Sequence, residues 1–422
     1  MIVEFSVKNF RSIKELQTLS MIAAPIKSKN EELDSENVFH LSGKLSLLKT
    51  AAIYGANGSG KSNLVKALIT MFVFIDRSLQ DDQIGKQVIE PFAFDRSSYE
   101  KPTFFQLVFM CKDVKYRYGF EVQGNDVKSE WLFGTPGKKE VYYFTRESNQ
   151  IQINEDKYLE GKGLENKTSP NSLFINVCKA FNGAVSKQII DFFKSNISAS
   201  TGVNDNGFRA ATLELIKEEA FKQKILSLLN DADFGIQGIT NKKITAVDLP
   251  EGTSKEIISR VTTEKLEFLL SKRPVFDENG KEIGARELLM DSQESDGTIK
   301  FFNYSGVILD KLENGGTLII DEFDARLHPL LTRKLVKMFN SPVSNRKNAQ
   351  LVFVTHDTNL LDNSLLRRDQ IYFTEKNKRS ETVLYSLADF KGIRNDATYE
   401  KDYIKGKYGA IPFLGNYEKL FE

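Results

Sequence analysis

Apolar and polar positions alternate over residues 2–9, and this pattern predicts a strand at the start of the chain. We expect a second strand over residues 16–23. Residues 45–54 are mostly apolar and end in a glycine-rich turn, which is typical of a buried strand. Leu64 begins an apolar series with helical spacing, and this series predicts a helix over residues 61–79.

The middle of the chain predicts antiparallel strands first and helices afterwards. Two apolar runs within residues 103–123 flank a charged turn, which indicates a hairpin. Further strands are expected over residues 127–133 and 141–145. Helical spacing follows over residues 184–194 and 210–229.

The C-terminal part alternates helical patterns with short apolar runs, which indicates a parallel sheet. The expected elements are a helix over residues 296–312, a strand over 317–320, a helix over 328–339, a strand over 350–355 and a last strand over 370–373.

The patterns divide the chain into three expected parts. Residues 1–164 and 291–422 are expected to form the two halves of one α/β head. Residues 165–290 are expected to form an insertion that is helical first and mixed afterwards, and its sequence assigns it no role.

Charge and cysteine content narrow the class of protein. Basic residues number 58 and acidic residues 57, so no net field draws the chain to nucleic acid or membrane, and composition leaves nucleic-acid binding open. Cys111 and Cys178 form neither a metal pair nor a disulfide framework, which favours a reducing compartment. The helical regions contain no apolar run near the roughly 20 residues of a membrane span. We expect a cytoplasmic protein with no signal peptide and no membrane contact.

A glycine-rich segment lies between the strand at 45–54 and the helix at 61–79, and it fits G-x-x-x-x-G-K-[ST]. Its glycines let backbone N–H groups converge on phosphate oxygens, and the helix N-terminus favours anions. This context argues against a chance turn. Lys61 is expected to reach the β- and γ-phosphates and Ser62 to bind Mg²⁺. The expected binding residues are Gly55, Asn57, Gly58, Ser59, Gly60, Lys61, Ser62 and Asn63.

Two adjacent acids, Asp321 and Glu322, follow the apolar run at 317–320. A buried strand rarely ends in paired carboxylates unless they have a partner. Beside a phosphate loop, that partner is Mg²⁺: Asp321 would hold the metal and Glu322 would polarise the attacking water. The alternative, a strand–loop junction with solvated acids, is less favoured next to such a loop.

Two of the three histidines have an informative position. His356 follows the strand at 350–355, where a neutral imidazole would hydrogen-bond the γ-phosphate; the alternative is a structural or surface role. His328 precedes Pro329 and a predicted helix, so it either belongs to the nucleotide site or caps the helix. His40 has no context that assigns it a role.

The order of phosphate loop, glycine-containing turn, acidic strand end and histidine resembles that of ABC-type ATPases. The turn is Glu294-Ser295-Asp296-Gly297-Thr298, a loose match to the family's signature. The resemblance implies that Ser295 and Gly297 of one copy contact the γ-phosphate held by another, so that ATP joins a homodimer. A plain capped helix start is the alternative. The resemblance to ABC-type ATPases also implies the fold: an ABC/SMC-type P-loop NTPase head whose mixed sheet has a parallel core. It implies ATP and Mg²⁺ as cofactors.

The stretches VKNFRSI, DEFDARLHPLL, VTHDTNLLD and YIKGKYGAIP narrow the resemblance to the RloA/AbiLi-like ATPases of bacterial defence loci, relatives of OLD and RecF/SMC ATPases. It covers residues 1–130 and 285–415. It implies that Arg11 supports the nucleotide site and that His328 lies near the dimer seam. No glutamine is assigned to the Q-loop.

The resemblance implies an ATPase that dimerises around ATP and regulates an effector, a nuclease or toxin encoded nearby, in anti-phage defence. The alternative is a RecF/SMC-like DNA-binding ATPase of DNA repair, which needs a basic surface. Basic runs near Arg273, Arg367 and residues 376–379 are candidates for that surface, and solvated charge is the other interpretation of each. A transporter ATPase fits less well because of the VKNFRSI start and the large insertion.

Overall fold

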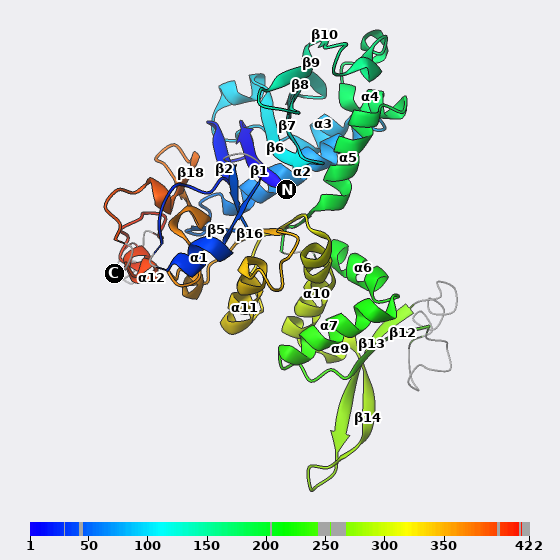
Figure 1. Ribbon diagram of the computed structural model, residues 1–422, viewed down its shortest axis with the longest axis vertical. Coiled ribbons are helices and arrows are strands. Elements are labelled where there is room, and N and C mark those ends of the chain that lie inside the picture. The colour runs from blue at the N-terminus through cyan, green and yellow to red at the C-terminus, as the bar shows by residue number, and fades with distance from the viewer. Residues whose placement is uncertain are drawn as a thin grey trace. The chain divides into compact units, whose positions relative to one another are not determined.

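The computed structural model describes residues 1–28, 30–41, 45–202, 205–243, 254, 267–394, 397–412 and 415 (Figure 1). The chain divides into two compact units. The larger unit contains Met1–Val203, Lys311–Asp324 and Thr332–Glu422, and the smaller unit contains Asn204–Asp310 and Ala325–Leu331.

A six-stranded sheet forms one half of the larger unit. In spatial order its strands are β11 (Ile197–Ser200), β15 (Thr317–Ile320), β16 (Gln350–Val354), β5 (Thr50–Gly55), β17 (Ile371–Lys376) and β18 (Thr382–Ser386). All neighbours pair in parallel except β18, which runs antiparallel to β17. The central strands β15, β16 and β5 are buried throughout, as the apolar runs require. The sequence prediction of a parallel core is therefore confirmed.

The expected single strand over residues 45–54 is wrong. The chain forms β4 (Ser46–Leu48) before β5, and β4 pairs with β3 (Val38–His40). Lys49 lies between the two strands and is buried, and its ammonium group donates a 3.0 Å hydrogen bond to the carbonyl oxygen of Asn340. A buried lysine with its own acceptor thus interrupts the apolar run.

A seven-stranded antiparallel sheet forms the other half of the larger unit. Its order is β10 (Gln150–Ile153), β9 (Val141–Glu147), β8 (Asp126–Thr135), β7 (Val114–Gln123), β6 (Thr103–Cys111), β1 (Ile2–Lys8) and β2 (Gln17–Ser20). The expected hairpin over residues 103–123 is confirmed as β6 and β7, with Lys112 and Asp113 at positive φ in the turn.

Helix α2 (Lys61–Arg77) packs against strands of both sheets, β5 on one side and β1 and β6 on the other. In its predicted apolar series, Leu64, Val65 and Leu68 are buried and Phe72 is half-buried. Phe74 stacks on Phe120 of β7 with ring centroids 5.2 Å apart. The core around α2 fixes the helix start, which lies directly after the glycine-rich loop. The larger unit also contains α1 (Glu31–Glu36), α3 (Ile84–Val88), α4 (Phe174–Ala180), α5 (Ala184–Asn196) and α12 (Tyr399–Ile404).

The smaller unit combines helices with a three-stranded sheet of β12 (Gly238–Lys243), β13 (Glu267–Phe276) and β14 (Glu282–Leu289). The β13–β14 hairpin extends away from the rest of this unit (Figure 1). The expected helix over residues 210–229 is wrong: it is two helices, because the chain turns at Lys217 and Glu218. The helices are α6 (Asn206–Leu215), α7 (Glu219–Asp231) and α9 (Met290–Gln293). Helices α10 (Asp296–Asn314) and α11 (Pro329–Asn340) run from one unit into the other.

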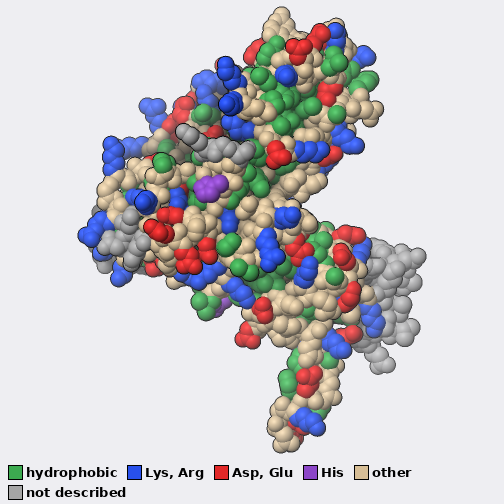
Figure 2. Space-filling view, in the orientation of Figure 1, with side chains coloured by type: hydrophobic (Ala, Val, Ile, Leu, Met, Phe, Trp, Pro, Cys, Tyr) green, Lys and Arg blue, Asp and Glu red, His purple; other side chains and the backbone are tan. Residues whose placement is uncertain are grey.

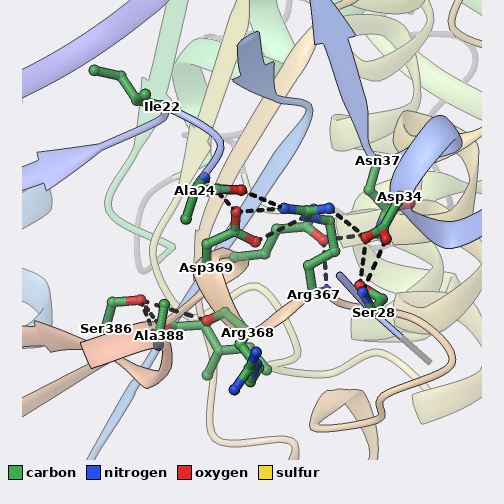
Figure 3. Close-up of polar contacts among 12 residues, drawn as sticks. Ile22, Ala24, Ser28, Asp34, Asn37, Arg367, Arg368, Asp369, Ser386 and Ala388 are labelled. Atoms are coloured by element: carbon green, nitrogen blue, oxygen red, sulfur yellow. Dashed lines mark hydrogen bonds and ion pairs between the residues drawn. The ribbon is translucent and has the colours of Figure 1, made fainter. Parts of the chain in front are cut away.

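A buried charge cluster fixes the segment before α1 to the loop before β17 (Figure 3). Arg367 donates hydrogen bonds to Asp369 at 3.0 and 2.9 Å, to the carbonyl oxygen of Ala24 at 3.1 Å and to Asp34. Because Arg367 is buried and paired, it cannot contribute to a basic nucleic-acid surface. Among the described helices, none has the length and apolarity that a membrane crossing needs.

Candidate functional site

The glycine-rich loop joins the end of β5 to the start of α2 with its tip toward solvent. Asn57 and Gly58 are exposed, and Gly58 has φ 74° with no atom within 4 Å of an added Cβ. Gly60 has φ 109° and is the residue before α2; a Cβ there would lie 2.0 Å from Thr382 Oγ1. Both positions therefore favour glycine, and the open tip can admit a phosphate.

The loop is supported by hydroxyl groups from the strands on one side of β5. Ser59 Oγ and Thr374 Oγ1 lie 2.6 Å apart, and Thr382 Oγ1 donates to the carbonyl oxygen of Ser59 at 2.9 Å. Ser12 bonds Thr382 at 2.8 Å and accepts from Asn63 Nδ2 at 2.7 Å. Local sequence did not indicate Ser12, Thr374 or Thr382, because the two threonines reach the loop through the pairing of β5, β17 and β18, and Ser12 through its bond to Thr382.

Lys61 lies at the first position of α2 and points back into the loop. Its ammonium group donates to the carbonyl oxygens of Gly55 at 2.8 Å and Ala56 at 3.1 Å. Burial lowers the pKa of Lys61 to about 8, against the opposing effect of the carboxylates that follow β15. The lysine ammonium group is a compact point charge on a long stem, a kind of cation that binds phosphate oxygens.

The acids after β15 lie beside the start of α2. Asp321 is buried and accepts hydrogen bonds from the Ser62 hydroxyl and from the Glu322 N–H, the latter at 3.1 Å. Burial raises the pKa of Asp321, and these two donors oppose the rise. Glu322 has φ 50°, a left-handed backbone that is uncommon outside glycine.

Ser62 and Asp321 supply a hydroxyl and a carboxylate oxygen to one point. Mg²⁺ binds few protein oxygens of this kind and completes its shell with water and phosphate oxygens. The donor set therefore fits Mg²⁺ together with a bound polyphosphate. No cluster of three or more acidic, histidine or cysteine side chains that would hold a metal unaided occurs among the described residues.

The loop after β11 contacts Asp321 through Ser200 and Gly202, and the local sequence gave no indication of this contact. The N–H of Asp321 donates to the carbonyl oxygen of Ser200 at 3.0 Å. Gly202 has φ 74°, and a Cβ there would lie 2.1 Å from the carbonyl oxygen of Asp321. The glycine is required for this close approach.

His356 follows β16, the strand between β15 and β5. The backbone N–H of His356 donates a 3.2 Å hydrogen bond to Asp324 Oδ1, which links His356 to the acidic segment after β15. Burial and the nearby Lys61 ammonium group both lower the pKa of His356, which favours the neutral imidazole. Asp324 is a further acid at the site that the sequence analysis did not assign.

Arg11 lies in a turn beside Ser12 and has φ 51°. Its NH2 group donates to Glu90 Oε1 at 2.5 Å, and its backbone N–H donates to the Glu90 carbonyl oxygen at 2.8 Å. Arg11 therefore lies next to Ser12, which bonds Thr382 and Asn63 beside the glycine-rich loop.

The remaining predicted residues lie in the smaller unit. Ser295 caps α10: its Oγ accepts from the Thr298 N–H at 3.2 Å. A Cβ at Gly297 would lie 2.6 Å from the carbonyl oxygen of Arg326, so the turn and the segment before His328 approach each other closely. His328 is exposed, and its Nδ1 accepts from the Leu330 N–H at 3.2 Å at the start of α11.

The signature-like turn is held by β13. Glu294, whose side chain is 3% exposed, accepts hydrogen bonds from Arg273 Nε at 2.8 Å and NH2 at 2.6 Å and from Ser271 Oγ at 2.5 Å. Despite the opposing effect of burial, these donors lower the pKa of Glu294. The hairpin is thereby tied to the residue that precedes Ser295.

The parallel sheet, the loop between β5 and α2, and the acids that follow β15 define an α/β P-loop NTPase fold. The chain belongs to the family described as "AAA domain, putative AbiEii toxin, Type IV TA system", which matches residues 51–362. No curated protein matches it.

The solved structures that are similar to the chain include two SMC heads. One is the SMC head domain from Thermotoga maritima, with a TM-score of 0.38 and 11% identity over 91% of this chain and 98% of that chain. The other is the SmcHead bound to the C-winged helix domain of ScpA, with a TM-score of 0.41 and 14% identity over 92% of this chain and 98% of that chain.

Proposed function

We propose that the chain binds ATP with Mg²⁺ at the loop between β5 and α2 and hydrolyses it to ADP and phosphate. One observation carries the proposal: Lys61, the Ser62–Asp321 pair and Glu322 converge at one edge of the parallel sheet. Such a cluster supplies a cation, metal ligands and a base to a single polyphosphate.

Each group has a distinct role in this proposal. The N–H groups of residues 57–60 bind phosphate oxygens, and Lys61 exchanges its loop carbonyls for the β- and γ-phosphates. Ser62 and Asp321 would hold Mg²⁺, and the bound ion would supply positive charge against the developing phosphate charge. Glu322 accepts a proton from the attacking water. Neutral His356 hydrogen-bonds the γ-phosphate, because its lowered pKa leaves a ring nitrogen able to donate without a full charge.

Binding and turnover of purified protein test this directly. Wild type should bind ATP and release phosphate. Lys61→Ala should lose most ATP binding, whereas Glu322→Gln should bind ATP and lose turnover by roughly 10²- to 10⁴-fold, the usual contribution of a general base. Turnover in Glu322→Gln equal to wild type would remove Glu322 from the mechanism.

The proposal extends to a homodimer joined by ATP. Ser295 and Gly297 stand at the exposed N-terminal end of α10, where a helix dipole and backbone N–H groups favour an anion. In the dimer they would contact the γ-phosphate on the other copy, with His328 near the seam. Arg11 would support the nucleotide on its own copy.

We further propose that this dimer regulates a partner effector, a nuclease or toxin, in anti-phage defence in the cytoplasm. The description of the matching family, a putative toxin of a type IV toxin–antitoxin system, supports such a context. ATP would stabilise the closed dimer and hydrolysis would release it, because the two states bind nucleotide differently.

A pull-down of tagged Glu322→Gln protein with ATP and Mg²⁺ from its native host, read by mass spectrometry, tests the partner. Recovery of a neighbouring nuclease or toxin would support the defence role. Recovery of DNA and repair factors would favour the RecF-like alternative. On the face shown in Figure 2, basic and acidic side chains are interspersed, and Arg273 and Arg367 are engaged in ion pairs.

A further inference from the structure

A cavity of about 450 Å³ in the larger unit adjoins the first turn of α2. It lies between the turn at residues 11–12, the segment at 89–99 and the end of β17. The residues that carry its chemistry are Arg11, Asn63, Glu90, Phe94, Tyr99 and Lys376.

The sheet order places this cavity on the far side of the loop from the acids. On one side of β5 lie β16 and β15, which lead into His356 and Asp321. On the other side lies β17, which ends at Lys376 in the cavity wall. Lys61 is the first residue of α2 and Asn63 the third, and Asn63 lines the cavity. A polyphosphate whose terminal group lies beside the acids therefore leads toward the cavity at its other end.

The cavity wall carries ring surfaces that remain in solvent. Phe94 and Tyr99 are 60% and 58% exposed, and Lys376 Nζ lies 5.6 Å from the Phe94 ring centroid. Exposed aromatic faces next to a cation are well suited to a flat heteroaromatic ring, which stacks on one and faces the other.

Arg11 adds an unused polar group. Its NH2 group is bound to Glu90, whereas its Nε is buried and has no hydrogen-bond partner within the described parts of the chain. A buried donor without an acceptor is costly, so a ligand acceptor at this point would be favoured.

We propose that this cavity binds the base and ribose of the nucleotide. Phe94 and Tyr99 provide the stacking faces, and Arg11 Nε donates to a ring nitrogen or ribose oxygen. The inference rests on the proposed ATP binding at the loop, and it names residues that determine how a nucleoside triphosphate is distinguished from a bare polyphosphate.

The test compares dissociation constants of ATP and inorganic tripolyphosphate for wild type, Phe94→Ala and Tyr99→Ala. Each substitution should weaken ATP binding by about tenfold, the usual effect of removing one stacking ring, and leave tripolyphosphate unchanged. Phe181→Ala is the matched control: Phe181 is 58% exposed and also has a lysine near its ring, Lys167 at 5.1 Å, but it does not line the cavity. It should change neither constant.

Three results would contradict the inference in distinguishable ways. If wild type binds ATP and both cavity variants bind it equally well, the base lies elsewhere and the proposed function stands. If both variants bind ATP and tripolyphosphate more weakly by the same factor, the two rings stabilise the glycine-rich loop and do not contact the base. If wild type binds neither ligand, the proposed function fails together with the inference.

Discussion

The ammonium group of Lys61 donates a 2.8 Å hydrogen bond to the carbonyl oxygen of Gly55, at the other end of the loop that we propose as a phosphate cradle. The ammonium group therefore has two acceptors within the loop, the carbonyl oxygens of Gly55 and Ala56. Its burial, which lowers the pKa to about 8, shows that the loop alone stabilises the charge incompletely.

ATP binding should therefore take up protons at alkaline pH. Phosphate oxygens favour charged Lys61, so binding raises its pKa above about 8; uptake should be small near about pH 7 and larger near about pH 9, and affinity should fall as pH rises through that window. Calorimetry with Mg²⁺ present, in buffers of different ionisation enthalpy, measures the uptake. Equal uptake at both pH values would contradict this role of Lys61.

On the proposed mechanism, the lowered pKa of His356 should give the pH–rate profile of turnover an acid limb. The neutral form predominates above the folded-state pKa, so turnover should be level near neutral pH and fall as pH drops below it. Between the folded-state pKa and the ordinary histidine value of 6.5, the unfolded chain binds more protons than the folded chain, so His356 costs stability as pH falls through that window. His356→Gln should remove this limb of the pH–rate profile. An unchanged profile in that variant would assign the limb to another group.

Gly202 should matter for turnover more than for ATP affinity. An added methyl group would lie 2.1 Å from the Asp321 carbonyl oxygen and displace the acids, and a shift of about 1 Å costs about 100-fold in rate. Phosphate release by Gly202→Ala should fall accordingly. Gly163→Ala is the control, because Gly163 has φ 80° with nothing within 4 Å, so it shares the backbone strain without the clash. Turnover in Gly202→Ala no lower than in Gly163→Ala would contradict this role of the close approach.

Arg273 should stabilise the turn at Ser295. Arg273→Ala leaves the buried Glu294 carboxylate without its guanidinium donor, which should destabilise the smaller unit by about 1–3 kcal/mol. Thermal melting and ATP-dependent dimerisation should both decline, with ATP binding to the monomer unchanged. Arg286→Ala, on the neighbouring strand and exposed, serves as control. If both variants lose the dimer, the positive charge of the β13–β14 hairpin is responsible, and the bond from Arg273 to Glu294 is not.

Local sequence predicts the features of this fold whose chemistry is local. The loop at residues 55–63 and the acids at Asp321 and Glu322 follow from consecutive residues, and the buried β5, β15 and β16 follow from their apolar runs. The contacts that shape the site come instead from distant segments: Gly202 reaches Asp321 because β11 pairs with β15, and Thr382 reaches Gly60 because β18 pairs with β17. Strand pairing of this range is not encoded in a local pattern, so these residues could not be predicted.

The claim that ATP joins two copies of this chain is tested most directly by sedimentation velocity of Glu322→Gln protein with and without ATP and Mg²⁺. The proposal predicts monomer without nucleotide and dimer with it, and loss of that dimer when Ser295→Arg is added, because the bulky side chain would occupy the exposed end of α10. A protein that binds ATP yet remains monomeric at saturating nucleotide would contradict the shared site.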